Sequence, residues 1–321
     1  MRPTFKDRKK QYRSIYEAVF RIPRIKLYEV SSILQVDRNT ASRRMEEAFK
    51  MGIIAGPQIR KRSFLNLLEY VYFVRFDDPV EAYLRYREDK NVVYHAIMDG
   101  FADLWITSNK ELDIDGDVIA GGPRSDYYVA FAPDHSWETA EKIMKSKVER
   151  FNPREYEPKG LIKTHWNETA NWDTEFDLLY REFKYNVRKK QTPVRKKYLI
   201  SGSKIQKWFK KLSEYCTIAT SYFPETFSAY NPYFIMVETD YEDFVIDLFS
   251  ELPTSSFFFK VSSKLFLYIF VNRYFLLGNA NVHTSELNQL FLRLLTRDLL
   301  KRGIIESESH ARPEWYCEKD L

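Results

Sequence analysis

The sequence predicts an α+β fold in which a winged helix-turn-helix unit, followed by a ferredoxin-like α/β sandwich, occurs twice in tandem. Three observations lead to this prediction: a weak internal repeat, an alternation of basic and acidic segments, and the same order of helix-like and strand-like patterns in each half. We expect four domains in the 321 residues, at 1–66, 67–168, 169–228 and 229–321.

The internal repeat matches residue class more often than identity. An offset of 164 positions places Val30 on Val194 and Ile54 on Ile218, and the same register continues into the strand-like part of each half. A period of this length is far beyond the roughly 20–50 residues of solenoid repeats. The order of elements also matches over the whole length, which two apolar helices aligned by chance would not produce. The repeat therefore indicates duplication and fusion of a whole two-part unit.

Charge alternates along the chain in step with the predicted domains, although the net charge is only +5. Residues 1–62 carry 16 Lys and Arg against 6 Asp and Glu, whereas residues 69–150 carry 10 against 17. Residues 173–215 carry 12 against 5, and residues 232–272 carry 2 against 6. A basic segment alone usually indicates only a solvated face, but segregation by domain favours a polyanionic partner for the basic units.

Composition favours a cytoplasmic globular protein. Apolar residue types make up 44% of the sequence, and 24 Phe and 22 Tyr supply bulk for several cores. The sequence has no uninterrupted apolar run of about 18 residues, so we expect no membrane span. The basic start at residues 1–10 has no apolar signal region. Cys216 and Cys317 are the two cysteines and lack a CxxC spacing, which suits a reducing compartment.

The first basic segment has the pattern of a helix-turn-helix. Apolar positions predict short helices at residues 14–20 and 26–34, followed by a tight turn. Asp37 suits an N-cap, because its carboxylate can accept hydrogen bonds from the free amides of the next helical turn. The helix that begins at Arg38 stops at Gly52, a typical C-terminal glycine, and an extended basic hairpin follows. This order is that of a winged helix-turn-helix.

The outward side of that third helix carries candidate DNA-reading residues. The N-terminal end of a recognition helix meets base edges in the major groove, where Arg suits guanine and Asn suits adenine. Cations on the wing contact phosphate and add affinity rather than specificity. The candidate base-reading residues are Arg38, Asn39, Ser42 and Arg43, and the candidate phosphate contacts are Arg44, Arg60, Lys61 and Arg62. The alternative is a winged helix that contacts only proteins, with arginines that merely aid solubility.

The second basic segment repeats this order with different chemistry. Helices are predicted at residues 176–183 and 193–198, and Ser201 suits the cap of a third. The outward face of the third helix is rich in lysine, which lacks the guanidinium fork that reads guanine. The candidate DNA-binding residues there are Lys204, Lys207 and Lys211. Neither a glycine stop nor a basic wing follows, so this unit serves either non-specific phosphate contact or a purely structural role.

Each acidic segment predicts a small α/β sandwich. Strand-like and helix-like patterns follow one another in nearly the order of a ferredoxin-like fold. The predicted elements are 69–76, 79–87, 92–98, 103–108, 125–132, 136–149 and 160–164 in the first copy, and 233–238, 242–250, 256–262, 265–271, 274–277, 285–301 and 303–306 in the second. Such a sheet has helices on one face only, so its other face must be covered. We expect the two sandwiches to pair, either within one chain or between two chains.

Three stretches of the first copy occur in a specific combination. They are Arg-Arg-Met-Glu at 43–46, Met-Gly-Ile-Ile at 51–54 and Asp-Gly-Phe-Ala-Asp-Leu at 99–104. This combination resembles the Lrp/AsnC family of feast/famine transcription regulators, and the second copy matches in outline only. The resemblance implies that the sandwich domain dimerises and binds an amino acid or another small effector near the dimer interface. The residues implied for effector binding are Asp99, Gly100, Phe101 and Asp103.

We therefore predict a sequence-specific transcription regulator that binds double-stranded DNA, is not an enzyme and needs no cofactor. A second reading comes from certain tetrapyrrole decarboxylases, which resemble fused Lrp/AsnC-like units without DNA binding. They would need a porphyrin-sized pocket with basic and histidine residues beside the sandwich sheet, and the acidic sandwiches oppose binding of a polyanionic tetrapyrrole. A third reading is a protein-interaction module.

The sequence shows no metal-binding or catalytic motif. Residues 113–117 resemble the start of a calcium-binding loop, but Val118 stands where that loop needs glycine and Arg124 stands where it needs glutamate. The histidines show no spacing typical of metal ligands; they are His95, His135, His165, His283 and His310. We therefore predict no metal site and no catalytic residue.

Overall fold

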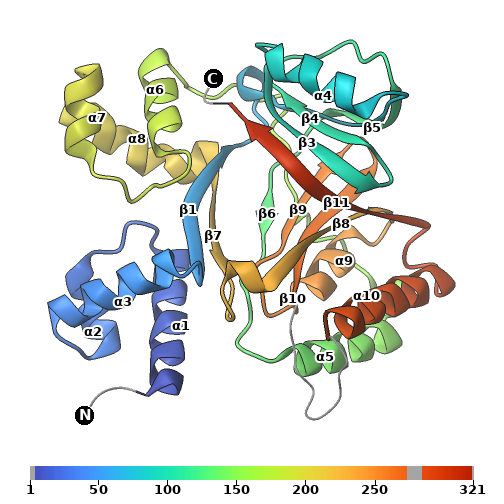
Figure 1. The fold of residues 1–321 in the computed structure, drawn as a ribbon, viewed down its shortest axis with the longest axis horizontal. Coiled ribbons are helices and arrows are strands. Elements are labelled where there is room, and N and C mark those ends of the chain that lie inside the picture. The colour runs from blue at the N-terminus through green and yellow to red at the C-terminus, as the bar shows by residue number, and fades with distance from the viewer. Residues whose placement is uncertain (1–3, 273–283, 320–321) are drawn as a thin grey trace.

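The computed structural model describes residues 4–272 and 284–319 and shows a mixed α+β chain (Figure 1). In the described part, ten α-helices surround a two-stranded and a nine-stranded sheet, and all strand pairs in both are antiparallel. The predicted α+β class is confirmed. The strand predicted at 274–277 and His283 lie outside the described residues.

The N-terminal unit consists of α1 (Phe5–Arg21), α2 (Leu27–Leu34), α3 (Arg38–Lys50) and the strand β1 (Ile54–Lys61). Asp37 caps α3 by accepting hydrogen bonds from two backbone N–H groups of the next turn, as its position in the sequence predicts. Gly52 follows α3 with a φ of +68°, a conformation that favours glycine. The three helices share one core, in which Ile15, Val30 and Ala41 are fully buried.

A second unit repeats this order with α6 (Thr174–Phe183), α7 (Gln191–Tyr198), α8 (Gly202–Tyr215) and β7 (Cys216–Tyr222). Ser201 caps α8 by accepting a hydrogen bond from the backbone N–H of Lys204. Phe183, Val194 and Trp208 are buried in its core. The helices of both units lie within a few residues of their predicted positions, because apolar spacing and capping residues are local signals. The exception is α1, which was predicted at 14–20 and begins at Phe5.

The two wing strands pair with each other. β1 runs antiparallel to β7, with Ile54 opposite Tyr222 and Lys61 opposite Cys216. This ribbon lies between the two helical units and the large sheet (Figure 1). The sequence predicts an extended basic hairpin after the third helix of the first unit. The structure instead makes that segment an internal joint, because β7 hydrogen-bonds along its length.

The large sheet has the strand order β5-β2-β4-β3-β11-β8-β10-β9-β6. Its strands from the first half of the chain are β2 (Tyr70–Arg75), β3 (Val92–Gly100), β4 (Leu104–Ser108), β5 (Asp117–Pro123) and β6 (Tyr128–Val129). Those from the second half are β8 (Tyr230–Glu238), β9 (Phe257–Val261), β10 (Lys264–Asn272) and β11 (Ser307–Glu318). Both halves thus contribute to one continuous sheet.

The strand β11 joins the two halves of the sheet. Its first residues pair with β8 and its later residues pair with β3, and Ala311 lies opposite both Phe234 and Gly100. The last predicted strand ends at residue 306, so β11 was not predicted. Its residues are mostly polar and include Pro313, so they lack the apolar alternation that identifies a strand. Two free sheet edges, rather than local preference, make this segment extended.

The sheet curls until its two ends approach each other. β6 pairs with β9, and the backbone N–H of Ser125 donates to the carbonyl of Lys260 at 3.0 Å. The inner faces of the two halves pack together, and the rings of Phe73 and Phe266 stack at a centroid distance of 4.5 Å. The two halves of the sheet therefore cover each other within one chain.

Helices cover the outer face of the sheet unevenly. α4 (Pro79–Glu88) packs on β3 and β4, whereas α5 (Trp137–Arg150), α9 (Glu242–Phe249) and α10 (Thr284–Lys301) pack around the second half of the sheet. Three short 3-10 helices are η1 (Leu65–Leu67), η2 (Pro153–Glu155) and η3 (Phe227–Ala229). The strand predicted at 160–164 is a loop instead, because Asp243 accepts the N–H groups of Lys159, Gly160 and Leu161. No helix within the described ranges has the length and apolar character of a membrane span.

Candidate ligand-binding site

A cavity of about 270 Å³ lies where the β1–β7 ribbon faces the inner side of the curled sheet. Its wall contains nine aromatic and four charged side chains, contributed by segments far apart in the sequence. The lining residues are Ala55, Gln58, Arg60, Glu69, Val93, Tyr94, Trp105, Thr107, Tyr127, Val129, Lys184, Thr217, Ala219, Ser221, Phe223, Phe227, Phe257, Phe259, Tyr268, Phe270 and Glu318.

Aromatic rings of three sheet strands form one wall of this cavity. The ring centroids of Tyr94 and Trp105 are 5.0 Å apart, and those of Tyr268 and Phe270 are also 5.0 Å apart. Burial raises the pKa of the phenols of Tyr94, Tyr127 and Tyr268 above the ordinary value. These phenols therefore stay protonated near neutral pH and can donate hydrogen bonds to a ligand.

Two cations and two carboxylates reach the same cavity. Lys184 Nζ lies 2.8 Å from Glu318 Oε1, and Arg60 Nη2 lies 3.7 Å from the same oxygen. Burial opposes the charged form of Arg60, but the electrostatic effects of Tyr180 and Glu318 outweigh it and raise the pKa of Arg60 above its ordinary value. Arg60 therefore stays charged, which makes it suitable for holding an anionic group.

Arg124 lies behind the wall and fixes two lining residues, Glu69 and Tyr127. Its side chain is 1% exposed, donates to Glu69 Oε2 at 2.6 Å and lies 4.1 Å from the centre of the Tyr127 ring. Burial alone would raise the pKa of Glu69, but the charge and hydrogen bond of Arg124 lower it. Glu69 is therefore held as a carboxylate at a fixed place on the wall.

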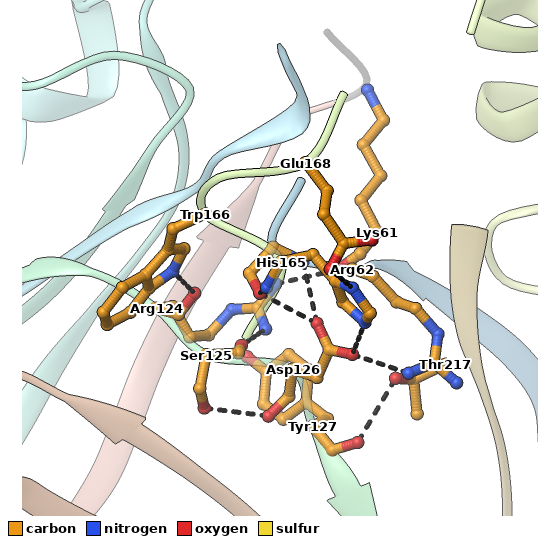
Figure 2. Close-up of polar contacts among 11 residues, drawn as sticks. Lys61, Arg62, Arg124, Ser125, Asp126, Tyr127, His165, Trp166, Glu168 and Thr217 are labelled. Atoms are coloured by element: carbon orange, nitrogen blue, oxygen red, sulfur yellow. Dashed lines mark hydrogen bonds and ion pairs between the residues drawn. The ribbon is translucent and has the colours of Figure 1, made fainter. Parts of the chain in front are cut away.

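Asp126 ties three segments together beside Arg124 (Figure 2). Its carboxylate lies 2.6 Å from Arg62 Nη1 and 3.3 Å from His165 Nε2, and it accepts a hydrogen bond from the backbone N–H of Ser63 at 2.8 Å. His165 Nδ1 lies 3.0 Å from Glu168 Oε1. The end of the wing, the sandwich and the loop after α5 are thus locked together, and this lock positions the wall of the cavity.

The three wing cations predicted to contact phosphate face the interior of the molecule. Arg60 lines the cavity, Lys61 Nζ lies 2.8 Å from Asp177 Oδ1, and Arg62 is bound to Asp126. Successive side chains of β1 point to opposite faces of the ribbon, and both faces are covered, one by the large sheet and the other by α6. A cluster of cations on a predicted hairpin has the same sequence pattern whether it faces solvent or a buried carboxylate.

Several of the other predicted DNA contacts are also engaged within the chain. Arg44 is 4% exposed and donates to Gln11 and Glu47, while Lys204 is paired with Asp173 and Lys211 with Glu214. Ser42 donates to Glu46. The residues that remain exposed are Arg38, Asn39, Arg43 and Lys207.

The predicted effector residues lie at the junction of the sheet halves rather than on the cavity wall described above. Phe101 is buried against Phe73, and its backbone N–H donates to His310. Asp103 accepts a hydrogen bond from the backbone N–H of Phe76 at 2.9 Å. Gly100 is placed so close to β11 that an added Cβ would overlap backbone atoms there. Asp99 is exposed.

The fold is similar to that of an enzyme. A crystal structure of the siroheme decarboxylase NirDL matches 96% of this chain and 92% of that chain, with a TM-score of 0.50 and 12% sequence identity. A second crystal structure, of NirDL in complex with an iron-uroporphyrin III analogue, matches 95% and 92%, with a TM-score of 0.45 and 11% identity. No protein-family model and no curated protein match the sequence.

This comparison corrects the main functional prediction. The matched fold, over nearly the whole of both chains, is that of an enzyme and not of a DNA-binding regulator, so the predictions of a transcription regulator and of a non-enzyme are wrong. The inward-facing wing cations give the physical reason. The Lrp/AsnC-like architecture fits loosely, at the level of the fold.

Of the residues that line the cavity, the sequence pointed only to Arg60, and to a different role for it. Tyr94, Trp105 and Tyr268 lie on predicted strands, and their alternation with other side chains places them on one face of the sheet. That alternation could have identified these three residues as neighbours on one face. No sequence pattern could have identified Lys184 and Glu318, because only the folded chain brings them together.

Proposed function

We propose that this protein is a tetrapyrrole-decarboxylase-like enzyme whose cavity binds a flat, carboxylate-bearing aromatic macrocycle. The observation that carries the proposal is the cavity itself, where an aromatic wall lies beside the paired cations Arg60 and Lys184. The likeness of the fold to siroheme decarboxylase supports the same class of ligand.

The chemistry of the wall suits such a ligand. Flat conjugated rings pack well against the faces and edges of Tyr94 and Trp105. Carboxylates on the ring edge would bind Arg60 and Lys184 through charge-assisted hydrogen bonds. The acidic character of the sandwiches is thus offset at the cavity by two cations.

The size of the cavity sets a condition on this proposal. About 270 Å³ is below the roughly 300–1,000 Å³ typical of ligand pockets, so a whole macrocycle requires the β1–β7 ribbon to move outward. None of the histidines in the described residues lines the cavity. Proton transfer would therefore depend on the phenols, the cations or water.

Decarboxylation needs two things from these residues. The leaving carboxylate departs as carbon dioxide, and the electron pair left on carbon takes up one proton. Because burial keeps Tyr94, Tyr127 and Tyr268 protonated, these phenols are our candidate proton donors. Arg60 and Lys184 would hold the remaining carboxylates and fix the orientation of the ring.

We also propose that the chain is a tandem repeat of a winged helix and a ferredoxin-like unit. Across the large sheet, the first four strands lie in the order β5-β2-β4-β3 and the next four in the order β11-β8-β10-β9. In both sets the strand that comes last in the chain lies first, followed by the first, third and second strands of that set. This repeated layout supports duplication of one unit. The four domain boundaries given above stay a prediction.

A binding titration tests the proposal. Iron-uroporphyrin III added to the protein should shift the absorption band of the macrocycle and saturate at one equivalent. Arg60→Gln should weaken binding about tenfold or more, because it removes a charge-assisted hydrogen bond worth roughly 1.5–3 kcal/mol. Arg38→Gln, on the exposed start of α3, is the matched control and should bind as the native protein does.

Activity is measured separately by incubating the protein with siroheme and following the loss of carbon dioxide by mass spectrometry. Saturable binding that Arg60→Gln weakens and Arg38→Gln does not would support the proposed site. An unchanged absorption band at any protein concentration would contradict it.

A further inference from the structure

Glu318 occupies the position that a ligand carboxylate would take. The two cationic side chains on the cavity wall, Arg60 and Lys184, both face this one carboxylate, at 3.7 Å and 2.8 Å. The side chain of Glu318 is 21% exposed, so it lies at the opening of the cavity rather than in its depth. In β-sheet register it lies opposite Tyr94, which places it beside the aromatic wall.

The end of β11 holds Glu318 in place without filling the cavity. Beyond Ala311 the strand pairs with β3 and no longer with β8. Lys319 fastens the chain on the other side, since its Nζ donates to the carbonyls of Tyr86 at 3.0 Å and Asp89 at 2.6 Å. The backbone is therefore anchored, and the carboxylate can leave the cations by a change of side-chain rotamer alone.

Glu318 supplies the counter-charge for these two partly buried cations, which would be costly to keep away from water without one. A ligand that brings its own carboxylate can replace Glu318 with little change in the number of ion pairs. A neutral ligand of the same shape cannot make that exchange and leaves Glu318 where it is.

We infer that Glu318 is an internal competitor that tests the charge of the ligand: a ligand carboxylate must replace it between Arg60 and Lys184. This inference rests on the proposed function, since it assumes that an anionic aromatic molecule enters the cavity. Replacement of Glu318 is a step in ligand binding that does not follow from the likeness of the fold to siroheme decarboxylase. When the product leaves with its remaining carboxylates, Glu318 returns to the cations.

The experiment uses two fluorescent probes that differ by one charge. Anilinonaphthalene sulfonate is a flat aromatic anion, and N-phenyl-1-naphthylamine is the same molecule without the sulfonate. Glu318→Gln removes the competing charge and keeps the shape, so it should tighten binding of the anionic probe roughly three- to tenfold. Binding of the neutral probe should not change.

Glu314→Gln is the matched control, because Glu314 lies on the same strand, is exposed and pairs with Arg312 instead. Glu314→Gln should leave both probes unaffected. Adding Arg60→Gln to Glu318→Gln should cancel the gain for the anionic probe.

The outcomes separate this inference from the proposed function. Glu318→Gln that leaves the anionic probe unchanged, or that tightens both probes equally, would overturn the inference whatever the macrocycle does. A selective gain for the anionic probe supports it. If that gain appears while iron-uroporphyrin III binds neither protein, the tetrapyrrole proposal fails and the role of Glu318 stands.

Discussion

At the residue scale, the interior of the protein holds an ionisable group that the cavity does not use. His95 lies on β3 and is 0% exposed, with its ring 4.4 Å from that of Tyr83. Burial and the charge of Lys319 lower the pKa of His95 to about 4. The folded protein therefore keeps this ring neutral under conditions in which an unfolded chain would protonate it.

This shift predicts acid sensitivity in a defined window. The ordinary pKa of 6.5 is higher than the folded value of about 4, so only the unfolded state binds the proton between these values. The free energy of unfolding should fall as pH drops from 6.5 to 4, by up to about 3 kcal/mol, and should not depend on His95 above pH 7. Urea denaturation of the native protein and of His95→Leu at pH 7, 6 and 5 checks this. An equal loss of stability in both proteins would contradict it.

Among the charged and polar residues, helix caps could be predicted from the sequence, but ion-pair partners could not. Asp37 and Ser201 cap helices as predicted, because a cap depends on neighbours within one turn. Arg60 and Arg62 have sequence contexts that fit a solvated wing equally well. Their partners Glu318 and Asp126 are far away in the sequence, so no local pattern identifies them.

At the element scale, the junction of β3 with β11 decides whether the sheet is continuous. Gly100 has a φ of +140°, and an added Cβ would overlap the carbonyl oxygen of His310 across the junction. The Asp-Gly-Phe turn, which the family resemblance assigns to an effector, thus has a structural reason for its glycine. Close approach of two strands needs a residue without a side chain.

We expect Gly100→Ala to destabilise the protein by about 3 kcal/mol, the sum of a backbone penalty of about 1 kcal/mol and overpacking against β11. Gly160→Ala is the control: Gly160 has a φ of +63°, but nothing lies within 4 Å of its added Cβ. It should cost only the backbone penalty. Thermal and urea denaturation compare the two variants, and equal losses would contradict the clash.

Element types were more predictable than element partners. Apolar spacing placed α2, α3 and α8 within a few residues, because helix periodicity is local. The pairing of β1 with β7, the position of β11 and the packing of α5 against the second half of the sheet depend on which free edge or face is available. These edges and faces form only when the chain has folded, so a local sequence pattern does not identify the partners.

At the scale of the whole molecule, a single chain supplies what other folds obtain by dimerisation. The inner faces of the two sheet halves cover each other, and the packing of Phe73 against Phe266 leaves no apolar face for a second copy there. The sequence predicted the pairing but left open whether it would occur within or between chains. The intervening strand β11 resolves it.

We therefore expect stability that does not depend on protein concentration. An intramolecular core gives a urea midpoint that is unchanged over a hundredfold dilution, whereas an obligate dimer loses stability on dilution. Denaturation curves over that range, with mass measured in parallel by light scattering, check the expectation. A midpoint that falls on dilution would show that a second chain completes the core.

The central place of β11 also has a consequence during biosynthesis. The ribosome makes β11 after every other strand of the sheet, yet the strand sits between β3 and β8. Until it emerges, the nascent chain presents two unpaired strand edges at once, and such edges recruit other chains. Production of this protein should therefore depend on chaperones that shield those edges until translation reaches residues 307–318.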